Sequence, residues 1–362
     1  MADAFIYDHV RTPRGKGKPE GKLHEITSVQ LATQVLRALK SRNNLPADGV
    51  EEVILGVVTP AGEQAATLPR IAPILAGFAD EVTGLHINRF CASGLESVAL
   101  GAAKVMSGMC DMIIGGGVES MSRTPMGADG GGPWGIDPAV TGAVPFMLQG
   151  VAADLLATML GVTRADLDRY AVASQQRAAH AWNDGYFKNS VIPVTDILDC
   201  VVLDKDEYLR PETTLESLGA LKPAFETMGR QFGFDGVALQ RYPEVEQVIH
   251  LHTAGTSSGI VDGAGAVLVG NKEAGAKLGI KPRAKIRSFY SMGSEPQLFL
   301  RAPAPTCQKA LKKAGMTASD IDLWELNEAF AVVPLEVMQA LNIPHDKLNV
   351  NGGAIAIGHP LG

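Results

Sequence analysis

Residues 81–106 read EVTGLHINRFCASGLESVALGAAKVM, and this stretch decides the fold class. A short apolar run leads to Cys91, and small or apolar residues follow it at helical spacing: Leu95, Val98, Ala99, Ala102, Val105 and Met106. A helix that is small or apolar nearly all round should be buried. The stretch therefore predicts a strand that turns into a buried helix, which is the repeating unit of an α/β protein.

Cys91 lies at the turn between the predicted strand and the predicted helix. A thiol at a helix N-terminus faces free backbone N–H groups and the positive end of the helix dipole, and both favour the thiolate. A thiolate on a tight strand-to-helix turn is a well-placed nucleophile. A free cysteine is also a common structural residue of protein cores, so the position alone leaves both roles open.

The same alternation extends to both sides of this stretch. Apolar runs predict strands at 3–8, 52–58 and 111–117, and helical periodicity predicts helices at 27–40 and 65–76, the first capped by Thr27 or Ser28. Strands that alternate with helices favour a largely parallel sheet.

The composition changes at about residue 121. Residues 121–145 are rich in Gly, Pro and Met, helices are predicted at 150–160 and 163–184, and the chain is then irregular to about residue 250. We interpret residues 121–248 as an inserted loop domain, placed where loops carry function. Strand character returns at 248–251 and 265–269.

The last third of the chain repeats the first in outline. A predicted helix at 305–313 and a predicted strand at 321–326 parallel the elements at 27–40 and 52–58, and residues 348–351 enter a glycine pair as the earlier strand enters Cys91. Two copies of one strand–helix unit indicate an internal duplication.

Bulk composition excludes several classes of protein. The 362 residues carry a net charge of −7, which argues against a nucleic-acid partner. The four cysteines are widely spaced with no CxxC pair, so we expect a reducing compartment, no disulfide framework and no zinc site. No run of 18 apolar residues and no targeting segment is evident, so we expect no membrane span and a cytoplasmic location.

Two further segments contain residues suited to catalysis. His359 lies in NGGAIAIGHP (351–360), where glycines bring an imidazole close to a ligand or to Cys91, whose proton it can accept. Asn327 and Glu328 follow the predicted strand 321–326, at the end where α/β sheets place their sites. Asn327 can hold a water or donate to an oxyanion, and Glu328 can orient a water or His359. Alternatively, His359 is structural and Asn327 caps a helix.

These residues carry a resemblance. NRFCASGL (88–95), GGGVES (115–120), TAGTSSGIVDG (253–263), NEAFA (327–331) and GGAIAIGHP (352–360) come in the order and spacing of the thiolase family. The resemblance implies an α/β thiolase fold, with duplicated βαβαβαββ halves in a layered α-β-α-β-α sandwich. We expect residues 1–120 and 249–272 to form the N-terminal half, 121–248 the loop domain that binds coenzyme A, and 273–362 the C-terminal half.

The resemblance also implies roles for individual residues. Cys91 resembles the acyl-accepting nucleophile, and His359 resembles the base that activates it and donates to the thioester oxygen. Asn327 resembles the residue that holds the water of that oxyanion hole. Ser258 falls where the family contacts the pantetheine arm of CoA, and Lys222 falls near the nucleotide end.

The implied reaction is thiolytic cleavage of a 3-ketoacyl-CoA to acetyl-CoA and a shortened acyl-CoA, or the reverse Claisen condensation. Coenzyme A and acyl-CoA thioesters are the implied partners, with no metal and no redox cofactor, and the family implies a homodimer or homotetramer. The alternatives are an acetyl-CoA C-acetyltransferase that makes acetoacetyl-CoA, and a non-catalytic thiolase-like partner or fragment.

The chain departs from the family pattern in two places. The resemblance implies a second cysteine beyond His359, whereas the sequence ends at Gly362, so we expect it to be C-terminally incomplete and inactive as written. Leu148 stands where acetyl-specific members carry a histidine. An apolar residue there favours a roomier acyl pocket and a degradative enzyme for longer 3-ketoacyl chains.

Overall fold

In the computed structural model, which describes residues 2–362, a mixed seven-stranded sheet forms the framework of the first half. The strand order is β4-β3-β5-β8-β1-β9, and β2 pairs with β8. The strands are β1 (Phe5–Arg11), β2 (Gly15–Lys16), β3 (Glu52–Gly56), β4 (Thr83–Ile87), β5 (Met112–Ser120), β8 (Val261–Gly270) and β9 (Ala284–Lys285). β3 runs parallel to β4 and β5, whereas β8 runs antiparallel to β5 and β1. The predicted parallel part is therefore closed by one long antiparallel strand.

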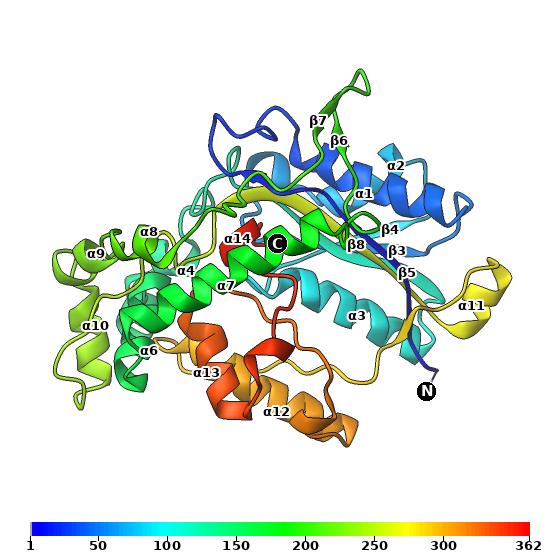
Figure 1. Ribbon diagram of the computed structural model, residues 1–362. Helices are drawn as coiled ribbons and strands as arrows, with labels where there is room; N and C mark the ends of the chain where they lie inside the picture. Colours follow the sequence, from blue (N-terminus) through cyan, green and yellow to red (C-terminus); the bar gives the residue numbers. More distant parts are fainter. Residues whose placement is uncertain (1) are drawn as a thin grey trace.

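Helices cover both faces of this sheet (Figure 1). α1 (Ser28–Arg42) and α2 (Leu68–Leu75) lie on one face, and α3 (Ser93–Ser107) lies on the other. Thr27 is the N-cap of α1, one of the two caps that the sequence predicts, and its side chain forms a capping box with Gln30. Buried leucines of α1, among them Leu31 and Leu36, form a large apolar cluster with β3, β5 and β8.

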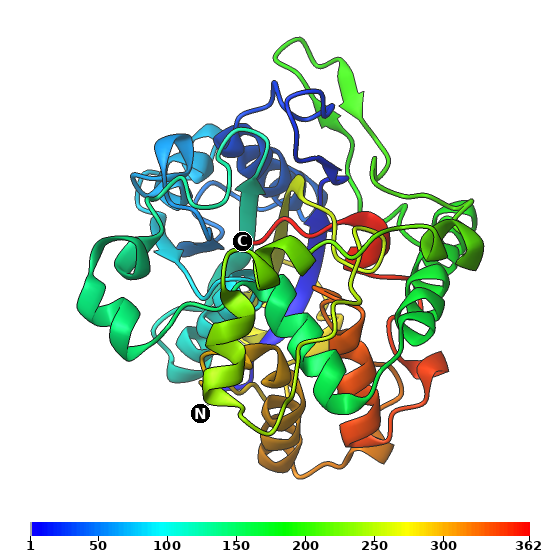
Figure 2. The same cartoon turned by 90° about the vertical axis from the view of Figure 1, so that its left-hand side faces the viewer.

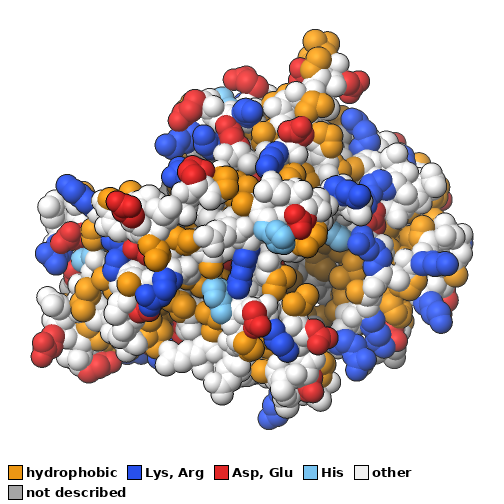
Figure 3. Space-filling view, in the orientation of Figure 1, with side chains coloured by type: hydrophobic (Ala, Val, Ile, Leu, Met, Phe, Trp, Pro, Cys, Tyr) orange, Lys and Arg blue, Asp and Glu red, His pale blue; other side chains and the backbone are white. Residues whose placement is uncertain are grey.

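α3 buries only one face, and the prediction of all-round burial is wrong. Gly101 and Ala102 pack toward the sheet, where a side chain at Gly101 would overlap Ile113. Leu95 at the start of the helix is 77% exposed. Figure 3 shows a hollow with an apolar floor over this helix. The outer face stays open because residues 273–362 do not lay a second sheet on it.

Residues 121–248, the region expected to be inserted, contain several short helices, the 20-residue helix α7 and one small hairpin. Its elements are α4 (Gly132–Ile136), α5 (Pro138–Ala143), α6 (Gln149–Leu160), α7 (Arg164–Asn183), β6 (Val194–Thr195), β7 (Val201–Leu203), α8 (Leu215–Gly219), α9 (Glu226–Arg230) and α10 (Phe234–Arg241). Figure 2 views the molecule from the side of these helices. α6 and α7 are the two predicted helices, and Thr163 and Asp166 form a capping box at the start of α7.

The strand predicted at 248–251 is absent. The backbone N–H of Ile249 donates to Thr158 Oγ1 (2.9 Å), and that of Leu251 donates to Asp154 Oδ1 (3.0 Å). Because side chains of α6 take these N–H groups, the segment has no need of a neighbouring strand.

The last third forms helices but no second sheet. It contains α11 (Lys272–Lys277), α12 (Pro303–Ala314), α13 (Val332–Leu341) and α14 (Ala354–Ile357), and short 3₁₀ helices occur at Gly62–Gln64, Phe299–Arg301, Ala318–Asp320 and His345–Lys347. The segments predicted as strands at 321–326 and 348–351 meet in one parallel bridge, between Trp324 and Leu348. Side-chain bonds replace the ladder, because the Asn349 amide accepts from Leu326 N (2.8 Å) and donates to Leu326 O (2.8 Å). Of the two large sheets that the expected sandwich needs, residues 2–362 therefore form one, the seven-stranded sheet.

A second apolar cluster joins the inserted region to the last third. It includes Leu155 and Leu156 of α6 and Val332 and Val337 of α13. None of the helices within residues 2–362 is both long and apolar enough to cross a membrane.

Candidate active site

Cys91 occupies a tight turn between β4 and α3. The Ser93 hydroxyl accepts from Arg89 N (2.8 Å) and donates to Phe90 O (2.6 Å), which folds the chain back on itself. Phe90 has φ +47°, a left-handed backbone that is uncommon for a bulky residue. α3 begins at Ser93 with Ala92 as N-cap, so the thiol lies just before the helix, as the sequence predicts.

The environment of Cys91 opposes the thiolate. Burial raises the pKa of the Cys91 thiol above its ordinary value of 9.0, and the nearby Glu119 carboxylate raises it further. The side-chain amide of Gln149 hydrogen-bonds the thiol and acts in the other direction, as does the backbone at Cys91. Desolvation outweighs these donors, which corrects the expectation that the helix start alone favours a thiolate. A base is needed to take the proton.

His359 is suited to be that base. Burial, followed by the charge of Arg14, lowers the pKa of His359 to about 4. The ring is therefore neutral at pH 7 and can accept a proton. Its Nε2 is buried and has no hydrogen-bond partner among the residues described. A buried ring nitrogen left free is uncommon and points to a partner outside this chain's own contacts.

The segment that carries His359 is fixed at both ends. Arg14, which is half-buried, donates to the Gly358 carbonyl, and the Gly362 N–H donates to Glu119 Oε2 (2.9 Å). A side chain at Gly117 would overlap the Gly362 carbonyl, so the segment lies directly on the end of β5. Sequence reasoning missed Arg14 because its partner lies 344 positions away.

The His359 segment reaches the turn that holds Cys91. A Cβ built on Gly94 would lie 2.9 Å from the Gly362 carbonyl oxygen. Because three residues span at most about 11 Å, His359 shares one region with the start of α3. No hydrogen bond joins Cys91 to His359 among the described residues.

Residues 256–260 connect two of the sequence motifs. Ala331 N donates to Thr256 O (2.9 Å) and Ser258 N donates to Ala329 O (2.9 Å), on the side of NEAFA. His359 N donates to Gly259 O (2.9 Å), on the side of GHP. Residues 256–260, called the strap below, therefore bring the Asn327 and His359 segments together. The strap carries Ser258, whose side chain is half-buried.

Asn327 is exposed and does not cap a helix. α13 begins at Val332 with Ala331 as its N-cap, so the capping alternative is wrong. The neighbouring Glu328 is fully buried and accepts from Tyr170 Oη (2.8 Å), Ser174 Oγ (2.7 Å), Asn349 Nδ2 (2.9 Å) and Ile355 N (3.0 Å). Those donors occupy the carboxylate, which holds the loop that leads to His359 instead of contacting His359 itself.

Lys222 lies at the surface of the inserted region, near this same strap. Ala224 N donates to His252 O (2.8 Å), and the rings of Phe225 and Phe330 meet edge to face at 5.7 Å. Lys222 is exposed three residues before Phe225. The structure thus places a cation at the rim of the region where NEAFA lies.

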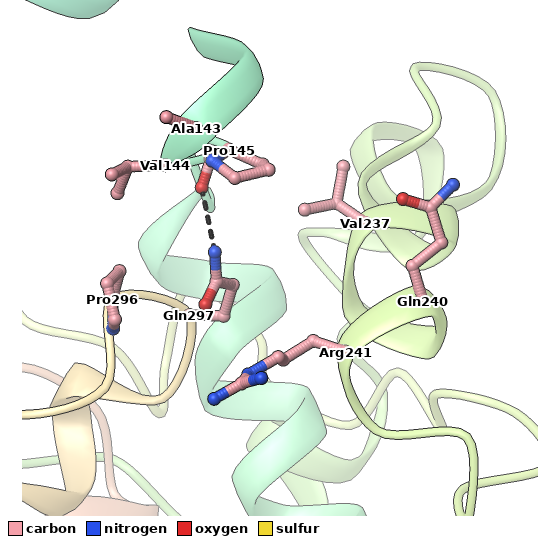
Figure 4. Close-up of a pocket in the computed structure, with 8 residues that line it drawn as sticks. All are labelled: Ala143, Val144, Pro145, Val237, Gln240, Arg241, Pro296 and Gln297. Atoms are coloured by element: carbon pink, nitrogen blue, oxygen red, sulfur yellow. Dashed lines mark hydrogen bonds between the residues drawn. The ribbon is translucent and has the colours of Figure 1, made fainter. Parts of the chain in front are cut away.

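Two pockets open among the described residues, and neither is lined by Cys91, Asn327 or His359. One of about 340 Å³ opens between α10 and the chain on either side of it, as Figure 4 shows; it is lined by Ala143, Val144, Pro145, Val237, Gln240, Arg241, Pro296 and Gln297. The other, of about 80 Å³, is lined by Arg11, Thr12, Arg14, Gly263, Ala264, Gly265 and Pro360. Within residues 2–362, no three His, Cys, Asp or Glu side chains are grouped so as to hold a metal ion.

Comparison with known families matches this arrangement. The model described as "Thiolase, N-terminal domain" matches residues 4–231, and "Thiolase, C-terminal domain" matches residues 280–362. The chain belongs to the thiolase family. The resemblance carried by the five motifs is thereby confirmed across most of the chain.

Individual members of the thiolase family are similar over the whole chain. The 3-ketoacyl-CoA thiolase of Cronobacter sakazakii is 37% identical over 369 residues, covering 100% of this chain and 89% of that protein. The 3-oxoadipyl-CoA/3-oxo-5,6-dehydrosuberyl-CoA thiolase of Escherichia coli K12 is 36% identical, with 100% and 90% covered. The structure of human mitochondrial 3-ketoacyl-CoA thiolase in complex with CoA superposes with a TM-score of 0.83 at 32% identity, covering 100% of this chain and 88% of that one. This likeness confirms the thiolase fold.

Proposed function

We propose that this chain acts on 3-ketoacyl-CoA through an acyl-Cys91 intermediate. It is an acyltransferase of the thiolase family, and the relatives named 3-ketoacyl-CoA thiolase support CoA-dependent thiolytic cleavage over the two alternatives. One observation carries the residue assignment: the 256–260 strap holds NEAFA and His359 together, while Gly362 brings the His359 segment to the Cys91 turn.

In the first half-reaction, His359 Nε2 takes the Cys91 proton and the sulfur attacks the C3 carbonyl of the substrate. The new S–C3 bond forms, the C2–C3 bond breaks, and the electron pair stays on C2 of the departing acetyl-CoA. That carbanion takes up one proton, which balances the proton lost by the thiol. The raised pKa of Cys91 and the lowered pKa of His359 support a neutral thiol–imidazole pair before attack.

In the second half-reaction, the thiol of free CoA attacks the acyl-Cys91 carbonyl. The CoA sulfur forms a bond to the acyl carbon and the bond from that carbon to Cys91 breaks. The proton of the CoA thiol passes to the released Cys91 sulfur, and acyl-CoA leaves. Both half-reactions develop an oxyanion, and donors aimed at that oxygen lower the barrier. We assign a water held by Asn327, together with His359, to one oxyanion and the Cys91 N–H to the other.

We assign CoA binding to the inserted region, taken as residues 121–248 between an N-terminal half of 1–120 and 249–272 and a C-terminal half of 273–362. Lys222 at its rim is suited to the nucleotide end, and Ser258 on the strap to the pantetheine arm. CoA enters as a substrate, and the proposed steps call on no metal or redox group.

Longer acyl chains are the proposed substrates. Leu148 is half-buried and packs against the second apolar cluster, so it adds apolar surface at the start of α6. We also propose a homo-oligomer that forms through β4. This strand is the edge of the sheet, and the adjacent α2 exposes Ile71, Ile74 and Leu75. A cytoplasmic location remains a prediction from the sequence.

The test compares the product of the complete reading frame with residues 1–362. Each is mixed with 3-ketoacyl-CoAs of several lengths and CoA, loss of the 3-ketoacyl absorbance is followed, and mass spectrometry locates any acyl adduct. An adduct on Cys91 that is absent from Cys91→Ser and present in Cys200→Ser, an exposed thiol outside the site, supports the proposal. A full-frame protein without turnover or adduct would overturn it in favour of a non-catalytic role. Turnover by residues 1–362 would contradict the expected inactivity.

A further inference from the structure

The pocket of about 340 Å³ beside α10 has no part in the proposed mechanism. Its volume is within the range of sites that bind small molecules. Val144 and Pro145 lie on one side of it and Val237 of α10 lies on the other, so both sides are apolar (Figure 4). Arg241, one turn after Val237, extends from α10 toward the side of Gln297. The pocket thus combines apolar walls with a single charged side chain.

Two hydrogen bonds hold the walls of this pocket together. The Gln297 side chain donates through Nε2 to the Pro145 carbonyl (3.2 Å), and only 6% of Gln297 is exposed. Tyr242, the C-cap of α10, donates through its hydroxyl to Glu295, two residues before Gln297. These bonds join residues that are 152 and 53 positions apart in the chain. The pocket is therefore formed by the fold itself, without a ligand.

Arg241 forms no ion pair with any carboxylate of residues 2–362. Glu295, which is close to the pocket in the chain, accepts from the Tyr242 hydroxyl and does not line the pocket. The Gln297 amide has a second N–H, because a primary amide carries two and one goes to the backbone. The site therefore offers a positive charge and N–H donors to an acceptor.

We propose that this pocket binds a carboxylate carried on an apolar stem of a few carbons. The planar guanidinium of Arg241 matches the two oxygens of a carboxylate, and the valine and proline walls cover the stem. A single cation between apolar walls suits one negative charge better than the two of a phosphate. Two sources carry this chemistry: a free short-chain acid, and the far end of the acyl chain of a 3-ketoacyl-CoA. Pro145 lies three residues before Leu148, where we expect the acyl pocket, and only this second source rests on the proposed function.

The first test measures the binding of free compounds. Saturation-transfer NMR titrates hexanoate, acetate and 1-hexanol against the product of the complete reading frame. We expect hexanoate to bind most tightly, because acetate lacks the stem and 1-hexanol lacks the charge. Arg241→Met should weaken hexanoate binding by about 10-fold, the usual effect of a lost charge-assisted hydrogen bond. Val237→Phe, which fills the apolar side, should weaken it as well. Arg230→Met on α9, an exposed arginine outside the pocket, is the matched control and should bind hexanoate as wild type does.

The second test identifies the source of the carboxylate. It compares kcat/KM for 3-oxosuberyl-CoA and 3-oxooctanoyl-CoA, whose acyl chains are equally long and end in a carboxylate and a methyl group. A fall of about 10-fold in this ratio in Arg241→Met assigns the pocket to the chain end. An unchanged ratio with weakened hexanoate binding assigns it to a free acid.

The inference is overturned if neither hexanoate binding nor the ratio depends on Arg241. It is also overturned if inorganic phosphate binds as tightly as hexanoate and displaces it. If wild type turns over neither thioester but binds hexanoate through Arg241, the inference stands and the proposed function fails.

Discussion

Two buried carboxylates, one in each half of the molecule, organise the site in different ways. Glu119 at the end of β5 accepts from the backbone N–H groups of Val58 (2.8 Å), Thr59 (3.1 Å) and Gly362 (2.9 Å), and from the Gln64 side chain (2.6 Å). Glu328 takes three of its four donors from side chains, two of them on α7.

The comparison teaches how each half specifies its part of the site. Glu119 binds mainly backbone N–H groups, two of them just after β3 and one at Gly362, so this arrangement tolerates changes in the surrounding side chains. Glu328 depends on the identities of Tyr170 and Ser174 in the inserted region. The second half has no ladder to position its loops, and side-chain hydrogen bonds take that role.

The largest expected effect comes from removing the base. His359→Asn should lower the rate of Cys91 acylation by about 10²–10⁴-fold, because a positioned base contributes about that much. In wild type, acylation should lose activity on the acid side only near pH 4, where His359 becomes charged. Stopped-flow acylation from pH 3.5 to 9 measures both, and an acid limb near 6.5 would show that His359 is solvated.

Removing the Glu328 carboxylate should have the second-largest effect, a loss of folding stability. Glu328→Ala leaves Tyr170, Ser174, Asn349 and Ile355 without their acceptor, and we expect a loss of about 3–5 kcal/mol in the free energy of unfolding. Urea denaturation measures it, with Glu216→Ala on α8 as an exposed control. A loss below 1 kcal/mol would mean that water replaces the carboxylate, and the contrast between the two halves would not hold.

A side chain at Gly117, where β5 contacts the Gly362 carbonyl, should lower the folding stability by a smaller amount. Gly117→Ala places a methyl group where the Gly362 carbonyl lies, so we expect about 1–3 kcal/mol of destabilisation and displacement of the His359 segment. Gly142→Ala, which meets nothing within 4 Å, is the matched control. Thermal unfolding and acylation rates are the measurements. If Gly117→Ala unfolds at the same temperature and is acylated at the same rate as wild type, the His359 segment does not need its contact with β5.

The smallest effect is a pH dependence of the contact between the inserted region and His250, which follows it in the chain. His250 bonds Asp154 and Asp235, which raises its pKa above 6.5, and its bonds with His250 and His252 lower the pKa of Asp154 below 3.8. The His250 contribution is complete below pH 6.5 and is lost as pH rises through the raised value. The Asp154 contribution is complete above pH 3.8 and is lost as pH falls through the lowered value.

The stabilisation given by this pair should therefore be greatest between about pH 4 and 6.5. Urea unfolding of wild type and His250→Gln at pH 5 and pH 9 tests it: the difference in unfolding free energy between the two proteins should be larger at pH 5. An equal difference at both pH values would mean that His250 stays neutral in the folded protein.

Local pattern was enough to predict much of this molecule. The alternation around Cys91, the Thr27 and Thr163 caps and the helices α6 and α7 all follow from short-range spacing, which is where side-chain periodicity acts. The resemblance carried by the five motifs also predicts that Cys91 and His359 share one site.

The rest depends on contacts that spacing does not encode. The run at 248–251 is apolar enough for a strand, but Asp154 and Thr158 take its N–H groups. The role of Arg14 arises from a partner on a distant segment. The net direction of the Cys91 pKa depends on desolvation, which only three-dimensional packing determines.

The position of β8 has a consequence for how the protein is made. β1 pairs with β8 in a register that places Phe5 opposite Gly270, and β5 pairs with the same strand. At about 5–20 residues per second, a ribosome needs roughly ten to fifty seconds to deliver β8 after β1 has emerged. Until β8 emerges, β1 presents an unpaired, apolar edge, and so does β5 once it has been made. The yield of folded protein should therefore respond to translation speed and to chaperones that shield nascent strands.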